Sequence, residues 1–194
     1  MTGEPDYDHT LRRPCLCFTS ADSITANNEW GASCGPHSIA AMLGLSLDQV
    51  REHLVDFRGW MSPMMVGDTL RRLGAAYTLR KGMKTRGMCV GLNRVQWEGP
   101  WLNPGKPAAA AYAHTHWVAH VDGWVLCSLV DRASWMPLDA WEREVAKTEP
   151  PWHITHHYGL AVPAALRTGL QPHRSSALKP APPARSAQVQ LRLP

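Results

Sequence analysis

The chain has 194 residues, of which 44% are apolar, enough for one ordinary domain and some further length. Its formal charge of +4 comes from the C-terminal end, because residues 164–194 carry five basic side chains and no acidic one, whereas the residues before them carry 15 basic and 16 acidic ones. The predicted folded part is therefore close to neutral, which argues against a nucleic-acid-binding surface on it.

The five cysteines show neither a CxxC pair nor zinc-ribbon spacing, which predicts a reduced, cytoplasmic protein. The first 14 residues hold Glu, Asp and Pro where a signal peptide needs an apolar run. No stretch approaches the roughly 18 apolar residues of a membrane-spanning helix. We therefore expect neither a cleaved signal nor membrane association, and the sequence carries no signal for an oligomeric state.

The N-terminal part predicts an arm followed by a helix. Residues 1–22 are polar and contain two prolines. The segment ASCGPHSIAAMLG, residues 32–44, has apolar residues at helical spacing. Ser33 is a suitable N-cap and Gly44 a suitable C-terminal stop, so a helix is predicted between them.

Two further helices are expected before residue 75. Ser46 and Gln49 form a capping-box pattern at the start of one. The Ser62-Pro63 pair begins the other, which stops at Gly74.

Beyond Gly74 the chain turns to short β-rich runs, namely AYTLR, MCVGLNRVQW, THWVAHV, GWVLCSLV and WHITHHYGLAV. Asp122-Gly123 predicts a two-residue hairpin turn between the third and fourth runs, and residues 137–147 predict a helix. Residues 164–194, rich in Pro and Ala and basic, predict a disordered tail. The expected organisation is an arm (1–22), an α+β domain (23–163) with N-terminal helices packed on an antiparallel β-sheet, and the tail.

Cys34 is the first candidate catalytic residue. At the start of the predicted helix its sulfur would meet free backbone N–H groups and the positive end of the helix dipole, which favour the nucleophilic thiolate. The alternative is a buried structural cysteine. His116 opens a predicted strand, and a helix start that faces a strand start would give a Cys–His pair from two different elements.

Together, Cys34-Gly35-Pro36 and the later His116-Trp117-Val118 resemble the papain-like cysteine peptidase superfamily, most of all bacteriocin-leader-processing peptidase domains and small phage and bacterial relatives. The likeness covers about residues 23–145, with the Cys before the His by 82 residues. It implies a papain-like fold with the nucleophile at a helix start. It also implies a thiol hydrolase that cleaves a peptide or other amide bond, acts on a peptide or protein substrate and needs no cofactor.

The resemblance implies two further roles. An amide about six residues before the nucleophile would donate to the oxyanion, which points to Asn28, with Asn27 adjacent, where the family normally has Gln. An Asp or Asn would orient the histidine, and Asp131, 15 residues after it, fits this role, with Asp122 as the alternative. A gap-free match instead places Cys127 there, in which case the orienting group is lost.

Two rival interpretations remain. His114, His116 and His120 share one face of a regular strand, and His153 and His157 share another, so that three imidazoles could bind zinc. No HExxH or carboxylate-bearing motif accompanies them, and we expect no metal. The main alternative keeps the papain fold without turnover, as a binding or structural protein of the kind that phages encode, and the departures from the family pattern favour it.

Overall fold

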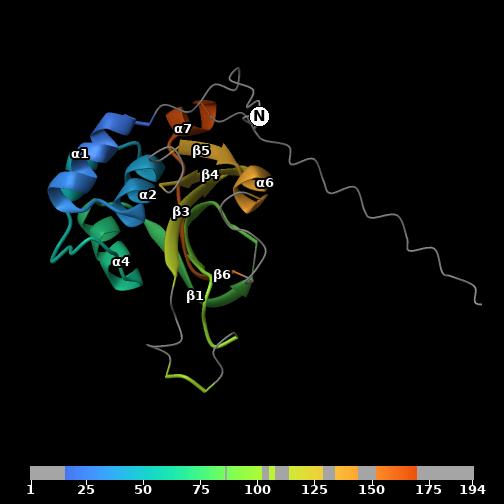
Figure 1. Cartoon of the computed structure of the whole chain (residues 1–194). Coiled ribbons are helices and arrows are strands. Elements are labelled where there is room, and N and C mark those ends of the chain that lie inside the picture. Colours follow the sequence, from blue (N-terminus) through green and yellow to red (C-terminus); the bar gives the residue numbers. More distant parts are fainter. Residues whose placement is uncertain are drawn as a thin grey trace, which may run out of the picture.

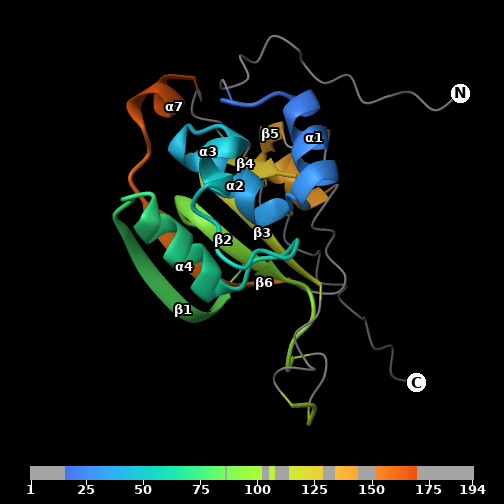
Figure 2. The ribbon, with the colours of Figure 1, turned by 90° about the vertical axis from the view of Figure 1, so that its left-hand side faces the viewer.

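Four helices come first in the chain and lie together on one side of a sheet (Figures 1 and 2). They are α1 (Ser20–Trp30), α2 (Cys34–Leu43), α3 (Leu47–Arg51) and α4 (Pro63–Arg72). The computed structural model describes residues 16–85, 87–101, 105–107, 114–128, 134–143 and 152–169.

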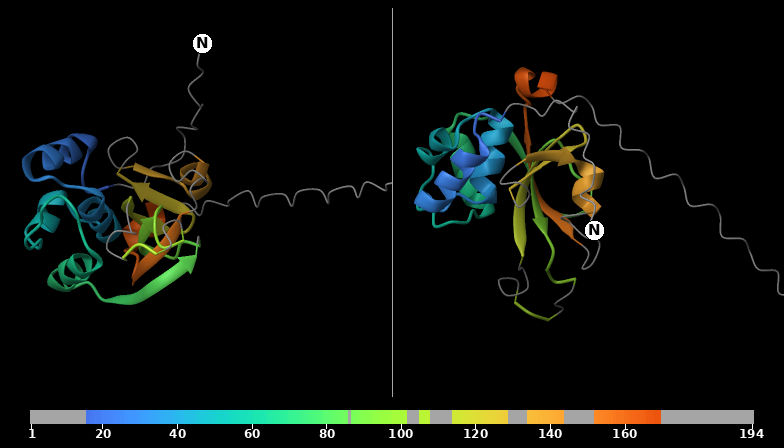
Figure 3. Two further views of the ribbon diagram at one scale, coloured as in Figure 1. Left: turned by 60° about the horizontal axis from the view of Figure 1, so that its bottom comes forward. Right: turned by 45° about the horizontal axis from the view of Figure 1, so that its top comes forward.

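The sheet has six strands in the order β1-β6-β2-β3-β4-β5, and every neighbouring pair is antiparallel. The strands are β1 (Tyr77–Thr85), β2 (Gly91–Gln96), β3 (Thr115–Val121), β4 (Trp124–Cys127), β5 (Ser134–Pro137) and β6 (His153–Leu160). A short helix, α6 (Leu138–Trp141), lies on the side of the sheet away from the first four helices (Figure 3). The predicted α+β class, with N-terminal helices against an antiparallel sheet, is confirmed.

The predicted helix boundaries follow the capping residues. Ser46 exchanges capping-box hydrogen bonds with Gln49 at the start of α3, and the Ser62 hydroxyl accepts from the first turn of α4. Gly44 ends α2 in the left-handed conformation, with φ 68°. These positions confirm the three predicted helix starts, although α3 is only five residues long.

Helix α1 begins inside the segment predicted as an arm. Thr19 and Asp22 form a capping box around its first turn, and Phe18, just before it, is buried in the core. The helix was missed because its only buried residues are Ser23 and Ala26, so that no apolar stripe marks it in the sequence.

The predicted disordered tail also needs correction at its start. Residues 164–169 form helix α7 (Ala164–Gly169), and Leu166 is buried against the core formed with the first helices. One apolar side chain in a Pro- and Ala-rich segment was too weak a signal to predict this. The rest of the predicted tail, and the predicted helix beyond residue 143, lie outside the described residues.

Both faces of the sheet are covered, and each face has its own core. Trp117 and Tyr158 belong to the core under the first four helices, whereas Val118 and Ile154 belong to the core on the other face, which includes Trp141 of α6. Strand β3 is buried from its second residue onward, so consecutive side chains enter different cores.

None of the helices in the described part of the chain is long and apolar enough to cross a membrane.

The hairpin between β3 and β4 sets the position of the site. Asp122 and Gly123 both have positive φ, 46° and 88°, which confirms the predicted two-residue turn. The pairing runs from Val121 opposite Trp124 to Ala119 opposite Leu126. In this register Cys127 lies diagonally across from His116.

Candidate active site

The first turn of α2 is docked on β3 by two side chains one helical turn apart. The backbone N–H of Trp117 donates to the Cys34 sulfur at 3.4 Å, and the Ser38 hydroxyl donates to the Trp117 carbonyl at 3.1 Å. Among the described residues the β3–β4 pairing ends at Ala119, and α2 takes up both backbone groups of Trp117, which lies beyond that end. The nucleophile candidate therefore rests against the residue that follows His116.

Gly35 allows this close docking. A Cβ at this position would lie 2.6 Å from the Met61 sulfur and 3.0 Å from the Met61 Cβ, so any larger residue would displace that side chain. The Met61 carbonyl accepts a hydrogen bond of 2.9 Å from the indole of Trp117. The Cys-Gly pair of the sequence thus has a packing reason as well as a chemical one.

His116 lies beside the sulfur of Cys127. Its Nε2 is 3.3 Å from Cys127 Sγ, and both side chains are buried. Trp97 stands next to the imidazole, with the ring centroids 6.4 Å apart. Of the alternatives raised for the group that orients the histidine, Cys127 is the one that contacts it among the described residues.

Of the two aspartates considered for orienting His116, the structure describes only Asp122. Asp131 lies outside the described residues. Asp122 is exposed in the hairpin turn at the far end of β3, where its charge acts on His120. The assignment of Asp131 stays a prediction.

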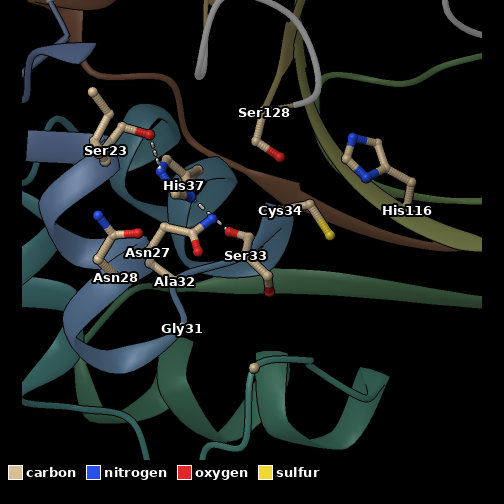
Figure 4. A pocket seen from close by; sticks show the side chains of 12 residues that line it. Ser23, Asn27, Asn28, Gly31, Ala32, Ser33, Cys34, His37, His116 and Ser128 are labelled. Carbon is tan, nitrogen blue, oxygen red and sulfur yellow. Dashed lines mark hydrogen bonds between the residues drawn. The ribbon is translucent and has the colours of Figure 1, made fainter. Parts of the chain in front are cut away.

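Cys34 and His116 line one cleft of about 590 Å³, between α1 and the sheet. In Figure 4 the imidazole of His116 extends toward the side of the cleft where Cys34 lies, and Ser128 lies beside them. Gly31 and Gly59, both with positive φ, form part of the wall close to Cys34. A cleft of this size can hold a few residues of a peptide or a small molecule.

Asn27 and Asn28 line the same cleft from the last turns of α1. In Figure 4 the Asn27 amide points toward Ser33 and Cys34, whereas the Asn28 amide lies farther from the sulfur. The predicted amide is therefore present in the cleft, and of the two side chains Asn27 points better toward Cys34. The oxyanion role proposed for Asn28 stays a prediction.

Burial sets the protonation of the Cys–His pair. It raises the pKa of Cys34, although the hydrogen bond from the Trp117 N–H acts in the opposite direction. Burial also lowers the pKa of His116 to about 4. The resting groups in the cleft are therefore a neutral thiol and a neutral imidazole. The expected thiolate at the helix start is corrected, because desolvation outweighs the helix terminus here.

Alkylation of Cys34 should show this neutral resting state. We expect its rate with iodoacetamide to rise with pH through a midpoint above the pKa of about 8.5 of an unperturbed thiol, with little labelling near pH 6. Peptide mass mapping after brief exposure at several pH values measures this, with glutathione as the reference thiol. A midpoint near pH 6 would show instead that Cys34 is held as a thiolate.

A second, smaller cleft of about 360 Å³ meets the first at Cys34. Its apolar wall comes from the segment before α4, where Trp60 is 63% exposed, together with Met61 and Trp117. Arg94 and Thr115 line it from the sheet, and the Arg94 guanidinium donates to the Thr115 hydroxyl at 3.2 Å. The nucleophile candidate thus lies where two clefts join.

The histidines considered for zinc have other contacts. His114 precedes β3 and lies 2.5 Å from a carboxylate oxygen of Glu98, and His120 accepts from a backbone amide of the hairpin turn. His157 donates to the Val90 carbonyl, His153 packs against Trp101, and His116 contacts Cys127. Within the described ranges no three His, Cys, Asp or Glu side chains are grouped so as to hold a metal ion.

Sequence reasoning missed His37 and Ser23. His37 is buried one turn after Cys34, with Nε2 2.7 Å from the Ser23 hydroxyl of α1 and Nδ1 2.7 Å from the Ser33 carbonyl. A histidine three residues after a candidate nucleophile is a visible signal. Its partner on α1 is not, because that helix was not predicted.

The site therefore combines a thiol at a helix start, a buried imidazole with a second thiol, and two clefts that meet at the first sulfur. No family model, curated protein or solved structure matches this chain.

Proposed function

We propose that this chain is a papain-like thiol hydrolase that cleaves a peptide or other amide bond, with Cys34 as nucleophile and His116 as its base. The observation that carries the proposal is the joint placement of the two side chains. The sulfur of Cys34 accepts from the backbone N–H next to His116, and both side chains line one cleft. A peptide or protein substrate agrees with two clefts that meet at the sulfur.

The cleft offers a candidate side chain or backbone group for each step of amide-bond cleavage. His116 would take the thiol proton as the sulfur bonds to the carbonyl carbon, because an imidazole with a pKa of about 4 does not ionise the thiol beforehand. The backbone N–H of Cys34, in the first turn of α2 and without an intrahelical acceptor, would donate to the oxyanion. Asn27 or Asn28 would supply the second donor. His116 would then return the proton to the leaving amine.

Cys127 gives the proposed enzyme an unusual third member. A thiol is a weak hydrogen-bond acceptor, so it holds the imidazole less firmly than a carboxylate or amide would. This observation favours the second candidate, a non-catalytic papain-fold protein whose cleft captures a peptide. Turnover separates the two candidates.

The protein is further proposed to work in a reducing, cytoplasmic setting. None of the four cysteines in the described part of the chain, Cys17, Cys34, Cys89 and Cys127, forms a disulfide bond there. Cys34 lines the cleft and Cys127 contacts His116, which also lines it. Oxidation there would disable a thiol nucleophile.

The test uses p-nitrophenyl acetate, which needs no knowledge of the natural substrate. We expect acetylation of Cys34 ahead of Cys17 and Cys89, located by peptide mass mapping. We also expect release of p-nitrophenol to continue beyond one equivalent per chain as the thioester is hydrolysed. The same measurement on the chain unfolded in urea gives the rate of an unassisted thiol.

A folded rate no greater than the urea rate would contradict the hydrolase proposal. Acetylation that stops at one equivalent would favour the non-catalytic candidate, because the site would then hold an acyl group without releasing it.

A further inference from the structure

His37 occupies an unusual place for a buried imidazole. It lies in the first turn of α2, is 3% exposed, and uses both ring nitrogens in hydrogen bonds of 2.7 Å. One bond reaches Ser23 on α1, and the other reaches the carbonyl of Ser33, the residue before the nucleophile. A buried group with two short polar contacts from different elements fixes the positions of both.

The contacts define which nitrogen carries the proton. A carbonyl oxygen only accepts, so Nδ1 of His37 must donate to Ser33. In the neutral ring Nε2 is then the acceptor, and the Ser23 hydroxyl donates to it. Burial lowers the pKa of His37, which keeps the ring in this neutral form.

The bonded carbonyl belongs to the peptide group that contains the Cys34 N–H. A peptide unit is planar, so a bond that fixes the direction of its C=O also fixes the direction of its N–H. The Ser33 carbonyl receives the Nδ1 bond of His37 and, at 3.4 Å, the backbone N–H of the same residue. The usual N-cap contact is missing, because the Ser33 hydroxyl makes no capping hydrogen bond.

We propose that His37, held by Ser23, is a positioning residue that aims the Cys34 backbone N–H at the oxyanion through the Ser33–Cys34 peptide. The proposal rests on the hydrolase function proposed above and adds a residue to it. His37 would not exchange a proton with the substrate. Its contribution would appear only in reactions that develop negative charge on a carbonyl oxygen.

Two reagents for the same thiol separate this role from a general structural one. With p-nitrophenyl acetate a C–S bond forms, the thiol proton passes to His116, and the C–O bond breaks to release p-nitrophenolate through an oxyanion. With iodoacetamide a C–S bond forms, the C–I bond breaks to release iodide, the thiol loses its proton, and no oxyanion develops. Both rates are measured at Cys34 in the full chain.

The variant His37→Leu removes both ring contacts at similar size. Loss of a complete oxyanion donor is worth about 10²–10³ in rate, so a donor that is present but misdirected should lower the acylation rate at least about tenfold. The alkylation rate should stay within about twofold, because the thiol and His116 are untouched. A thermal melt establishes that the variant is folded.

The variant His37→Asn is the matched control. Its side-chain amide nitrogen stands as many bonds from Cα as Nδ1 does, so it can donate to the Ser33 carbonyl and should restore most of the acylation rate. Ser23→Ala leaves the imidazole but removes the donor to Nε2. It should give a smaller loss with the same selectivity for acylation, and it keeps the test decisive if His37→Leu does not fold.

The outcomes separate the two proposals. Equal losses of acylation and alkylation, or no loss of acylation in either His37→Leu or Ser23→Ala, would overturn the positioning role while rapid acylation of the unsubstituted chain upheld the hydrolase. If the unsubstituted chain is acylated no faster at Cys34 than in urea, both proposals fail.

Discussion

Replacing His116 with alanine is expected to lower the acylation rate of Cys34 by p-nitrophenyl acetate about 10²-fold. General-base catalysis contributes about 10²–10⁴, and the lower end applies because an imidazole with a pKa of about 4 is a weak base at neutral pH. The rate should be level from about pH 5 upward until the thiol itself ionises. Stopped-flow release of p-nitrophenolate between pH 4 and pH 9 measures both features.

His120→Ala is the matched control for this loss. His120 lies on the same strand and face as His116 and is similarly buried, but it does not line the cleft. Its replacement removes a contact with the hairpin turn and should leave the acylation rate within about twofold, since no group in the proposed mechanism changes. Equal losses in the two variants would indicate that the effect of His116→Ala comes from disturbed packing of β3.

Acid is expected to destabilise the fold strongly between about pH 6.5 and pH 4. The folded pKa of His116 is about 4, below its ordinary value of 6.5, so the unfolded chain binds a proton in this window that the folded chain does not. The contribution of His116 to the free energy of unfolding is therefore fully present above pH 6.5 and is lost as the pH falls. The loss from this residue alone reaches about 3 kcal/mol at pH 4. Burial lowers the pKa of His37 and His120 in the same direction.

Urea unfolding at pH 7.5 and pH 4 tests this expectation through the difference between the two free energies of unfolding. His116→Gln should reduce that difference by about 3 kcal/mol, since glutamine does not titrate. A pH dependence identical in His116→Gln and the unsubstituted chain would show that His116 is not held neutral by the fold.

Local signals in the sequence predicted most of the fold. The Ser-Pro and Ser-Gln patterns marked the starts of α4 and α3, and Asp122-Gly123 marked the hairpin. These are interactions between residues at most four apart, so the sequence contains both partners. Helix α1 was not predicted, because it is held by its neighbours and carries no apolar stripe of its own.

The candidate site was predictable only in part, for the same reason. Cys34 and His116 were found from the elements at whose starts they lie, and their shared cleft agrees with that expectation. The Cys127 contact follows from the hairpin register, which could have been counted outward from Gly123. The partnership of His37 with Ser23 required the packing of α1 on α2, which no spacing in the sequence encodes.

The two hydrogen bonds from α2 to Trp117 determine how the site responds to a substrate. Cys34 and Ser38 hold the N–H and C=O of one residue, and that residue directly follows His116. The separation of the proposed nucleophile and base is therefore set by the packing of one helical turn on one strand, and not by a loop that must close. Such a site is organised before substrate arrives, so binding has no need to assemble it, and discrimination among substrates falls to the cleft walls rather than to an induced change of shape.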